Sequence, residues 1–183
     1  RQGEPLGLGH AVLCARAAVG DEPYFVHLAD DLIAGEPPCL TQMAAEYERH
    51  GGSVIAVETV PKEDTSSYGI VEVDDSSRIT KIVEKPAPED APSDSAVVGR
   101  YLLVPQIFDK LETTGRGAGG EIQLTDAIAD LLDESPVYAY SFTGERFDCG
   151  SKLGYLKATV SYGLSHPVTG TEFRQHLREL LDT

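Results

Sequence analysis

The sequence predicts an α/β protein built on a sheet flanked by helices, and two observations carry this prediction. Short apolar runs rich in β-favouring residues alternate with helix-forming stretches in the first part of the chain, which is typical of a sheet with crossover helices. The 183 residues, 41% of them hydrophobic, are enough to bury the core of one domain. We therefore expect a single domain, with residues 165–183 as a terminal helical tail.

Periodicity and turn residues predict the elements along the chain. Residues 10–18 are Ala-rich and predict a short buried helix, and residues 24–28 predict a buried parallel strand. A loop is expected at 33–38, and Thr169 to Glu172 has the spacing of a capping box before an amphipathic helix. Further strands are expected at 53–60, at 96–104 with an interruption at Gly99, and at 137–142, and residues 70–73 and 79–83 are expected to form a hairpin or an adjacent strand pair. Further helices are expected at 39–50, 121–132 and 152–164.

Charge and composition exclude several classes of protein. The chain has 30 acidic and 15 basic residues, a net charge of −15, so it is a poor candidate for binding nucleic acid or an anionic membrane. No apolar run has the length of a membrane span, and no signal peptide is visible at the given start. The three cysteines form no CxxC pair, so we expect reduced thiols, a cytoplasmic location and no structural zinc site.

Two carboxylates, Asp30 and Asp31, follow the predicted strand at 24–28. Ligands of open α/β sheets bind just beyond the carboxyl ends of strands, and a carboxylate there is suited to hold a hard divalent cation against phosphate oxygens. A solvated turn explains the same residues equally well. The opening loop is also ambiguous, because Gly7 and Gly9 let a backbone approach a ligand but also form ordinary turns.

Several short motifs occur in one order along nearly the whole chain. They read Leu-Ala-Asp at 28–30, Val-Glu-Lys-Pro at 83–86 and Asp-Cys-Gly at the start of 148–155. The remaining motifs lie at 2–12, 67–69, 98–101 and 120–126. In this order they resemble the sugar-1-phosphate nucleotidyltransferases and, among them, the bacterial UTP–glucose-1-phosphate uridylyltransferases.

The resemblance implies a fold and a reaction. The fold is the nucleotide-diphosphate-sugar transferase fold, a Rossmann-like mixed sheet flanked by helices. The reaction joins UTP and glucose 1-phosphate into UDP-glucose and pyrophosphate, by in-line attack on the α-phosphorus with Mg²⁺ as cofactor. Because no protein nucleophile is needed, catalysis rests on positioning and charge neutralisation. The full-length enzyme is expected to be a homo-oligomer.

The resemblance also assigns roles to residues of this chain. Asp30 and Asp148 would share the Mg²⁺, an ion that suits two hard oxygen ligands. Lys85 would meet the sugar phosphate as a catalytic point charge, and Glu84 would accept hydrogen bonds from sugar hydroxyls. Further sugar contacts are expected from Tyr68, Gly69, Gly99 and Tyr101, and contacts to the uracil edge from Gln2 and Gly7, with Gly9 and His10 beside them.

Five further residues keep more than one interpretation. Asp31 either supports a metal ligand from behind or is solvated. Glu121, Thr125 and Asp126 either contact the sugar or orient and cap the predicted helix. Lys152 either helps to hold phosphate or is a surface lysine.

One departure from the family pattern affects the expected activity. The family's Gly-x-Gly-x-Arg signature, with its following Pro-Lys, is absent from the 183 residues. That segment forms the first strand, the loop that cradles the triphosphate, and a catalytic Arg and Lys. We therefore expect a carboxy-terminal portion that lacks amino-terminal strands and turns over little or nothing alone. Two alternatives stay open, a glucose-1-phosphate thymidylyltransferase and a non-catalytic sugar-nucleotide-binding module.

Overall fold

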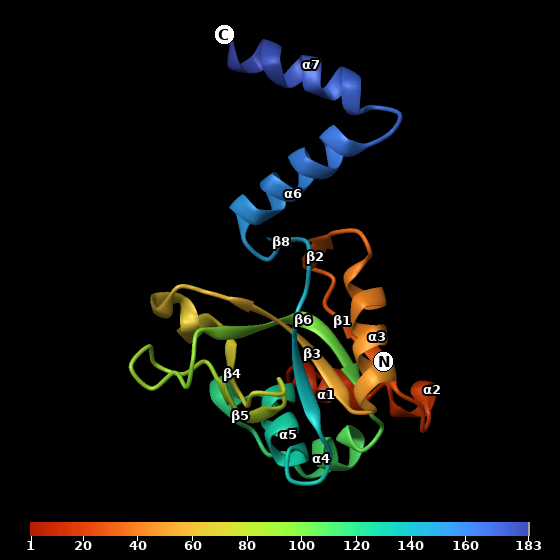
Figure 1. The fold of residues 1–183 in the computed structure, drawn as a ribbon, viewed down its shortest axis with the longest axis vertical. Helices are drawn as coiled ribbons and strands as arrows, with labels where there is room; N and C mark the ends of the chain where they lie inside the picture. The colour runs from red at the N-terminus through yellow and green to blue at the C-terminus, as the bar shows by residue number, and fades with distance from the viewer. Residues whose placement is uncertain (183) are drawn as a thin grey trace.

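The computed structural model describes residues 1–182 and forms a mixed sheet with helices against both faces (Figure 1). In the 6-stranded sheet, the β3–β7 pair is parallel and the other ladders formed by residues 1–182 are antiparallel. The predicted α/β class with a mixed sheet is thereby confirmed. The strands in spatial order are β5 (Ile79–Glu84), β4 (Gly69–Val73), β6 (Ser95–Leu103), β3 (Ser53–Thr59) and β7 (Val137–Ser141), with β1 (Tyr24–His27) also paired to β6.

Strand β6 lies at the centre of the fold, where it pairs with β1, β3 and β4, and its side chains are therefore buried on both faces of the sheet. Tyr101 and Leu103 belong to the core on one face, and Val98 and Leu102 belong to the core on the other. The helices that complete these cores are α1 (Leu8–Leu13), α4 (Ile107–Thr113) and α5 (Leu124–Leu131) on the first face and α3 (Cys39–His50) on the second.

The segment that follows Tyr24 differs from the prediction in two respects. Strand β1 is antiparallel to β6 and alternates between half-buried and exposed residues, with Phe25 40% exposed. The buried parallel strand predicted here is therefore wrong, because an apolar run does not encode the direction of its partner. The loop predicted at 33–38 is also wrong in part: β2 (Asp31–Ala34) pairs with β8 (Glu145–Asp148) in a separate two-stranded sheet, here called the ribbon.

The hairpin of β4 and β5 forms as predicted, with Gly69 opposite Glu84. Gly99 does not interrupt β6, contrary to the prediction, since the strand runs through it. Instead, the ladder with β3 shifts register between Ile55 and Val57. The irregularity is thus a bulge in the pairing, which absorbs extra residues without ending the strand.

Helices α6 (Lys152–Ser165) and α7 (Gly170–Leu181) project away from the sheet beyond the ribbon (Figure 1). Ser151 caps α6, because its hydroxyl accepts a hydrogen bond from the Gly154 amide at 3.0 Å. The capping box predicted at Thr169 is wrong: Thr169 has helical backbone angles, and its hydroxyl lies 3.1 Å from His166 Nδ1.

Two helix boundaries also differ from the prediction. The helix expected at 121–132 begins only at Leu124, and the helix expected at 10–18 is split into two short helices. No helix within residues 1–182 is both long enough and apolar enough to cross a membrane. The remaining short elements are α2 (Arg16–Val19), η1 (Lys62–Ser67) and η2 (Ala118–Gly120).

Candidate active site

A cavity of about 430 Å³ lies between the ribbon and the main sheet. Its walls come from segments that are far apart in sequence, and such convergence of polar groups on one hollow is typical of ligand sites. The charged and polar side chains that line it belong to Asp30, Asp31, Ser67, Tyr68, Glu84, Lys85, Tyr101, Gln123, Thr125, Arg146 and Asp148. The other lining residues are Leu8, Leu28, Gly69, Val97, Gly99 and Leu124.

The ribbon brings the two predicted metal carboxylates, Asp30 and Asp148, to one place. Asp31 is opposite Asp148 in the ladder, and the Cys149 amide donates to the Asp30 carbonyl at 2.7 Å. Asp30 Oδ2 and Asp148 Oδ1 lie 3.4 and 3.0 Å from the position that a β-carbon would take at Gly150. Any side chain at Gly150 would therefore fill the space that these two oxygens share.

This pair of carboxylates fits a hard cation such as Mg²⁺. Asp148 Oδ1 accepts one hydrogen bond from the Gly150 amide at 3.0 Å, and the Asp30 side chain has no partner within residues 1–182. No cluster of three or more His, Cys, Asp or Glu side chains suited to a metal occurs in this part of the chain. Mg²⁺ commonly binds one or two carboxylates and completes its shell with phosphate oxygens and waters, so two aspartates suffice.

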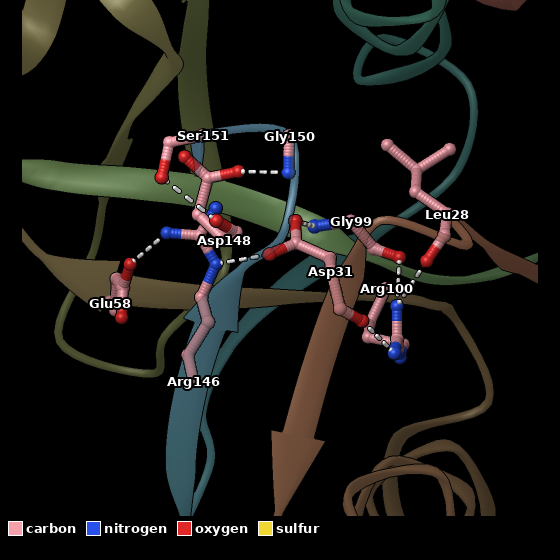
Figure 2. Close-up of polar contacts among 9 residues, drawn as sticks. All are labelled: Leu28, Asp31, Glu58, Gly99, Arg100, Arg146, Asp148, Gly150 and Ser151. Carbon is pink, nitrogen blue, oxygen red and sulfur yellow. Dashed lines mark hydrogen bonds and ion pairs between the residues drawn. The ribbon is translucent and has the colours of Figure 1, made fainter. Parts of the chain in front are cut away.

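Asp31 is only 7% exposed, so the solvated alternative predicted for it is wrong. Its Oδ2 accepts from the Gly99 amide at 2.8 Å, and its Oδ1 accepts from Arg146 Nε (Figure 2). The Asp31 carbonyl accepts from the Arg100 guanidinium, whose Nη1 also donates to the Gly99 carbonyl at 2.8 Å. Asp31 thus fixes the ribbon to β6 directly beside Asp30.

Arg146 lies in the cavity wall although it is not one of the residues predicted from the sequence. Its guanidinium pairs with Asp31 and Glu58 and lies 5.5 Å from the centroid of the Tyr68 ring. Burial lowers the pKa of Arg146, but its hydrogen bond to Asp31 and the charges of Asp31 and Glu58 outweigh burial and leave the pKa raised. Its spacing of two residues from Asp148, which places both on one face of a strand, is the signal that the sequence contains.

Glu84 and Lys85, at the end of β5, form another wall of the cavity. Glu84 Oε2 accepts from Thr125 Oγ1 at 2.8 Å, and Glu84 Oε1 lies 3.7 Å from Lys85 Nζ. Lys85 has a φ of 46° and its amide donates to the Tyr68 carbonyl at 2.9 Å, a strained conformation of the kind found at functional sites. A β-carbon at Gly69 would lie 2.8 Å from Thr125 Cγ2, so glycine leaves this corner open.

The predicted sugar-pocket residues Gly99 and Tyr101 line the same cavity. A β-carbon at Gly99 would lie 2.7 Å from both Asp31 Oδ2 and Leu28 Cβ, so a side chain there would displace the ribbon. Burial raises the pKa of the Tyr101 phenol, and the charges of Glu84 and Asp31 raise it further. The phenol therefore stays protonated and can donate a hydrogen bond.

The residues predicted to meet the uracil edge gather together but outside the cavity lining. Gln2 Nε2 donates to the Gly7 carbonyl at 3.2 Å and lies 3.1 Å from His10 Nδ1. β-carbons at Gly7 and Gly9 would lie 2.8 and 2.7 Å from the Ile122 carbonyl oxygen. These glycines therefore serve the packing of the loop on its own chain, and a role in binding the base stays a prediction.

Of the residues with several interpretations near α5 and α6, only Thr125 reaches the cavity. Glu121 is exposed, precedes α5 and accepts from Gln123 Nε2 at 3.4 Å, so it does not start the helix as predicted. Burial and a neighbouring aspartate raise the pKa of Asp126. Lys152 begins α6 and is exposed outside the cavity.

Comparison with known proteins shows that this chain is similar to several bacterial enzymes and structures of one kind. The UTP–glucose-1-phosphate uridylyltransferase YngB of Bacillus subtilis is 45% identical over 185 residues, which are 99% of this chain and 62% of that protein. The UTP-bound UGPase from Acinetobacter baumannii has a TM-score of 0.86 at 47% identity, over 97% of this chain and 63% of that one. A UDP-glucose pyrophosphorylase complexed with UDP-glucose has a TM-score of 0.85 at 42% identity, over 88% of this chain and 64% of that one.

This chain therefore spans between 62% and 64% of the length of these relatives. The family model described as nucleotidyl transferase matches residues 1–163, the part of the chain that contains the sheet, the ribbon and the whole cavity lining. The chain belongs to the nucleotidyl transferase family and, within it, is similar to the bacterial UTP–glucose-1-phosphate uridylyltransferases.

Proposed function

We propose that this chain provides the metal carboxylates and the sugar-phosphate pocket for Mg²⁺-dependent uridylyl transfer from UTP to glucose 1-phosphate, which yields UDP-glucose and pyrophosphate. One observation carries the proposal: a single cavity contains Asp30 and Asp148 together with Glu84 and Lys85. A cation site and a sugar-phosphate site in one hollow are what this reaction requires. The whole reaction is part of the proposal, because the chain spans 62–64% of its relatives.

Asp30 and Asp148 would hold the Mg²⁺. When bound, the ion would neutralise charge on the α-phosphate and so stabilise the charge that the transition state distributes over the phosphate oxygens. The Lys85 side chain is 52% exposed in its pair with Glu84, so its ammonium group can move to the phosphate of glucose 1-phosphate. The Glu84 side chain is 13% exposed and held by Thr125, so it presents a preset acceptor to sugar hydroxyls.

The chemical step needs no covalent bond to the protein. An oxygen of the sugar phosphate attacks the α-phosphorus of UTP in line, and pyrophosphate leaves on the opposite side. The residues of this chain act by positioning the two substrates and by charge. Recognition of uracil by Gln2 and Gly7, the cytoplasmic location and the homo-oligomeric state of the full-length enzyme stay predictions.

The names of the relatives support uridine as the base rather than thymidine. One relative is UTP-bound and another is complexed with UDP-glucose, at 47% and 42% identity. Both metal aspartates and the Glu84–Lys85 pair are present here, which favours an enzyme over a non-catalytic binding module. Low turnover by these 183 residues alone also stays a prediction, so the test of the proposal measures binding.

The test is a calorimetric titration of UDP-glucose into the protein with and without Mg²⁺. We expect saturable binding that needs Mg²⁺ and is abolished in the Asp30→Ala/Asp148→Ala double variant. The matched control is Asp75→Ala, because Asp75 is an exposed aspartate in the β4–β5 turn, outside the cavity. Circular dichroism establishes that each variant is folded.

Three outcomes would count against the proposal. Binding that persists in the double variant would remove the metal role of the aspartates. Equal affinity for a thymidine diphosphate sugar would favour the thymidylyltransferase alternative. Absence of binding by the folded wild-type protein would show that the cavity is not a preformed site for the product.

A further inference from the structure

The walls of the cavity belong to two separate sheets. The ribbon contains Asp148, and Asp30 immediately precedes its first strand. In the main sheet, Glu84 is the last residue of β5 and Tyr68 directly precedes β4. No ladder within residues 1–182 joins β2 or β8 to the main sheet. Apart from the chain itself and the backbone bond from the Leu28 amide to the Gly99 carbonyl at 2.9 Å, side chains that cross between the two sheets set the distance between a cation on the ribbon and a sugar phosphate at the main sheet.

Arg146 and Asp31 make most of these crossing contacts (Figure 2). Arg146, on β8, donates through Nη1 to Glu58 at the end of β3, and within the ribbon it donates through Nε to Asp31. Asp31 accepts from the Gly99 amide of β6 with its other carboxylate oxygen. The Arg100 guanidinium donates to the Asp31 carbonyl from the same strand. Two strands of the main sheet are thereby fixed to both strands of the ribbon.

The geometry of this network is set by the planar guanidinium of Arg146. The side chains of Arg146 and Asp31 are each 10% exposed, so their charges are poorly screened by water. The guanidinium directs two nitrogens at two carboxylates at a fixed angle, and the Tyr68 ring lies 5.5 Å away over it. Because Nε and Nη1 are both engaged by carboxylates, neither is free for a phosphate.

We propose that Arg146 is a positioning residue that sets the metal carboxylates over the sugar-phosphate pocket, acting through Asp31 and Glu58 without touching substrate. This inference rests on the proposed function, since it requires that Asp30 and Asp148 hold the cation. Without Arg146, the buried Asp31 carboxylate loses its ion-pair partner, with only the charge of Arg100 still acting on it, and the ribbon loses the contact of Arg146 with Glu58 on β3. The affinity for the cation then decreases although both of its ligands are intact.

The test is a titration with Mn²⁺, a paramagnetic substitute for Mg²⁺, followed by electron paramagnetic resonance in the presence of UDP-glucose. Arg146→Met and Glu58→Gln are each expected to weaken Mn²⁺ binding by about 10–100-fold, as is common for residues that orient metal ligands. Arg146→Lys keeps the positive charge but loses the planar guanidinium that binds two carboxylates, so its Mn²⁺ affinity should lie between those of Arg146→Met and the wild-type protein. The matched control is Arg49→Met, since Arg49 pairs with Glu46 on α3 outside the cavity.

Glu58→Gln decides the outcome even if Arg146→Met fails to fold, because Glu58 does not line the cavity. Unchanged Mn²⁺ affinity in Glu58→Gln would overturn the inference, and so would full rescue by Arg146→Lys. An effect of Arg146→Met on UDP-glucose affinity alone would also overturn it, because that result indicates direct contact with phosphate. Mn²⁺ affinity that is the same in Asp30→Ala as in the wild-type protein would instead overturn the proposed function, so the two failures are distinguishable.

Discussion

The two walls of the cavity are built in different ways. The hairpin wall depends on local register, since Gly69 is opposite Glu84 in a ladder between neighbouring strands. The ribbon wall depends on Arg146, which pairs with residues 115 and 88 positions away in the sequence. Backbone hydrogen bonds therefore shape the hairpin wall, whereas the ribbon, itself a two-stranded ladder, is held against the main sheet by a few buried charges. We expect substitutions among the buried charges of the ribbon wall to reduce both stability and cation affinity, and those in the hairpin wall to reduce affinity with little effect on stability.

The largest expected effect is that of Asp31→Ala in the ribbon wall. This change leaves the buried Arg146 guanidinium with Glu58 as its one remaining carboxylate partner within residues 1–182, and breaking a buried ion pair typically costs about 3–5 kcal/mol. The free energy of unfolding from urea denaturation measures it. The adjacent control Asp30→Ala removes an exposed side chain and should change that free energy by less than about 0.5 kcal/mol. Equal effects of the two substitutions would show that the buried charges do not hold the ribbon.

A smaller loss of stability is expected for Gly99→Ala. The new β-carbon would lie 2.7 Å from Asp31 Oδ2 and from Leu28 Cβ, so the ribbon must move away from β6. Overpacking of this kind costs about 1–3 kcal/mol, measurable by the same denaturation. Gly115→Ala is the matched control, because a β-carbon there meets nothing within 4 Å. A harmless Gly99→Ala would mean that the close approach of the ribbon to β6 is not required for stability.

In the hairpin wall, Glu84→Gln should reduce affinity with little effect on stability. Hydrogen bonds to charged groups contribute about 1.5–3 kcal/mol, so the KM for glucose 1-phosphate of the complete enzyme should rise roughly 10–100-fold. The hydrogen bond from Thr125 can be kept by the glutamine, so the free energy of unfolding should change by less than about 1 kcal/mol. Glu89→Gln, in an exposed loop, is the control. An unchanged KM would remove Glu84 from the sugar pocket.

The difference between local and long-range contacts also determines how much of the site could be predicted from the sequence. Glu84, Lys85, Asp30 and Asp148 stand in short contiguous motifs, so they could be identified and do line one cavity. The spacing of two residues from Asp148 places Arg146 on the same face of its strand, but it does not identify the role of Arg146, because that role depends on partners that only the fold brings together.

The fold shows a related limit. The β4–β5 hairpin was predicted correctly from two β-rich runs and the polar turn between them. The direction of β1 and the pairing of β2 with β8 were not, since four-residue strands contain too few residues for a pattern. At Thr169 a correct local spacing was overridden, because the hydroxyl contacts His166 instead of the helix backbone. Predictions from local sequence patterns therefore fail in this protein where a residue outside the pattern provides the contact instead.

The smallest expected effect lies outside both walls, on the projecting helix α6. Leu156 is 59% exposed, so Leu156→Ser should change the free energy of unfolding by less than about 0.5 kcal/mol. Ala158 on the same helix is 3% exposed, and Ala158→Asp should destabilise the protein by more, because it buries a carboxylate without a partner. A large loss of stability in Leu156→Ser would show that this face of α6 is covered in solution by a contact that residues 1–182 do not make among themselves. In that case α6, like the ribbon wall, depends for its stability on a partner that is distant in sequence or belongs to another molecule.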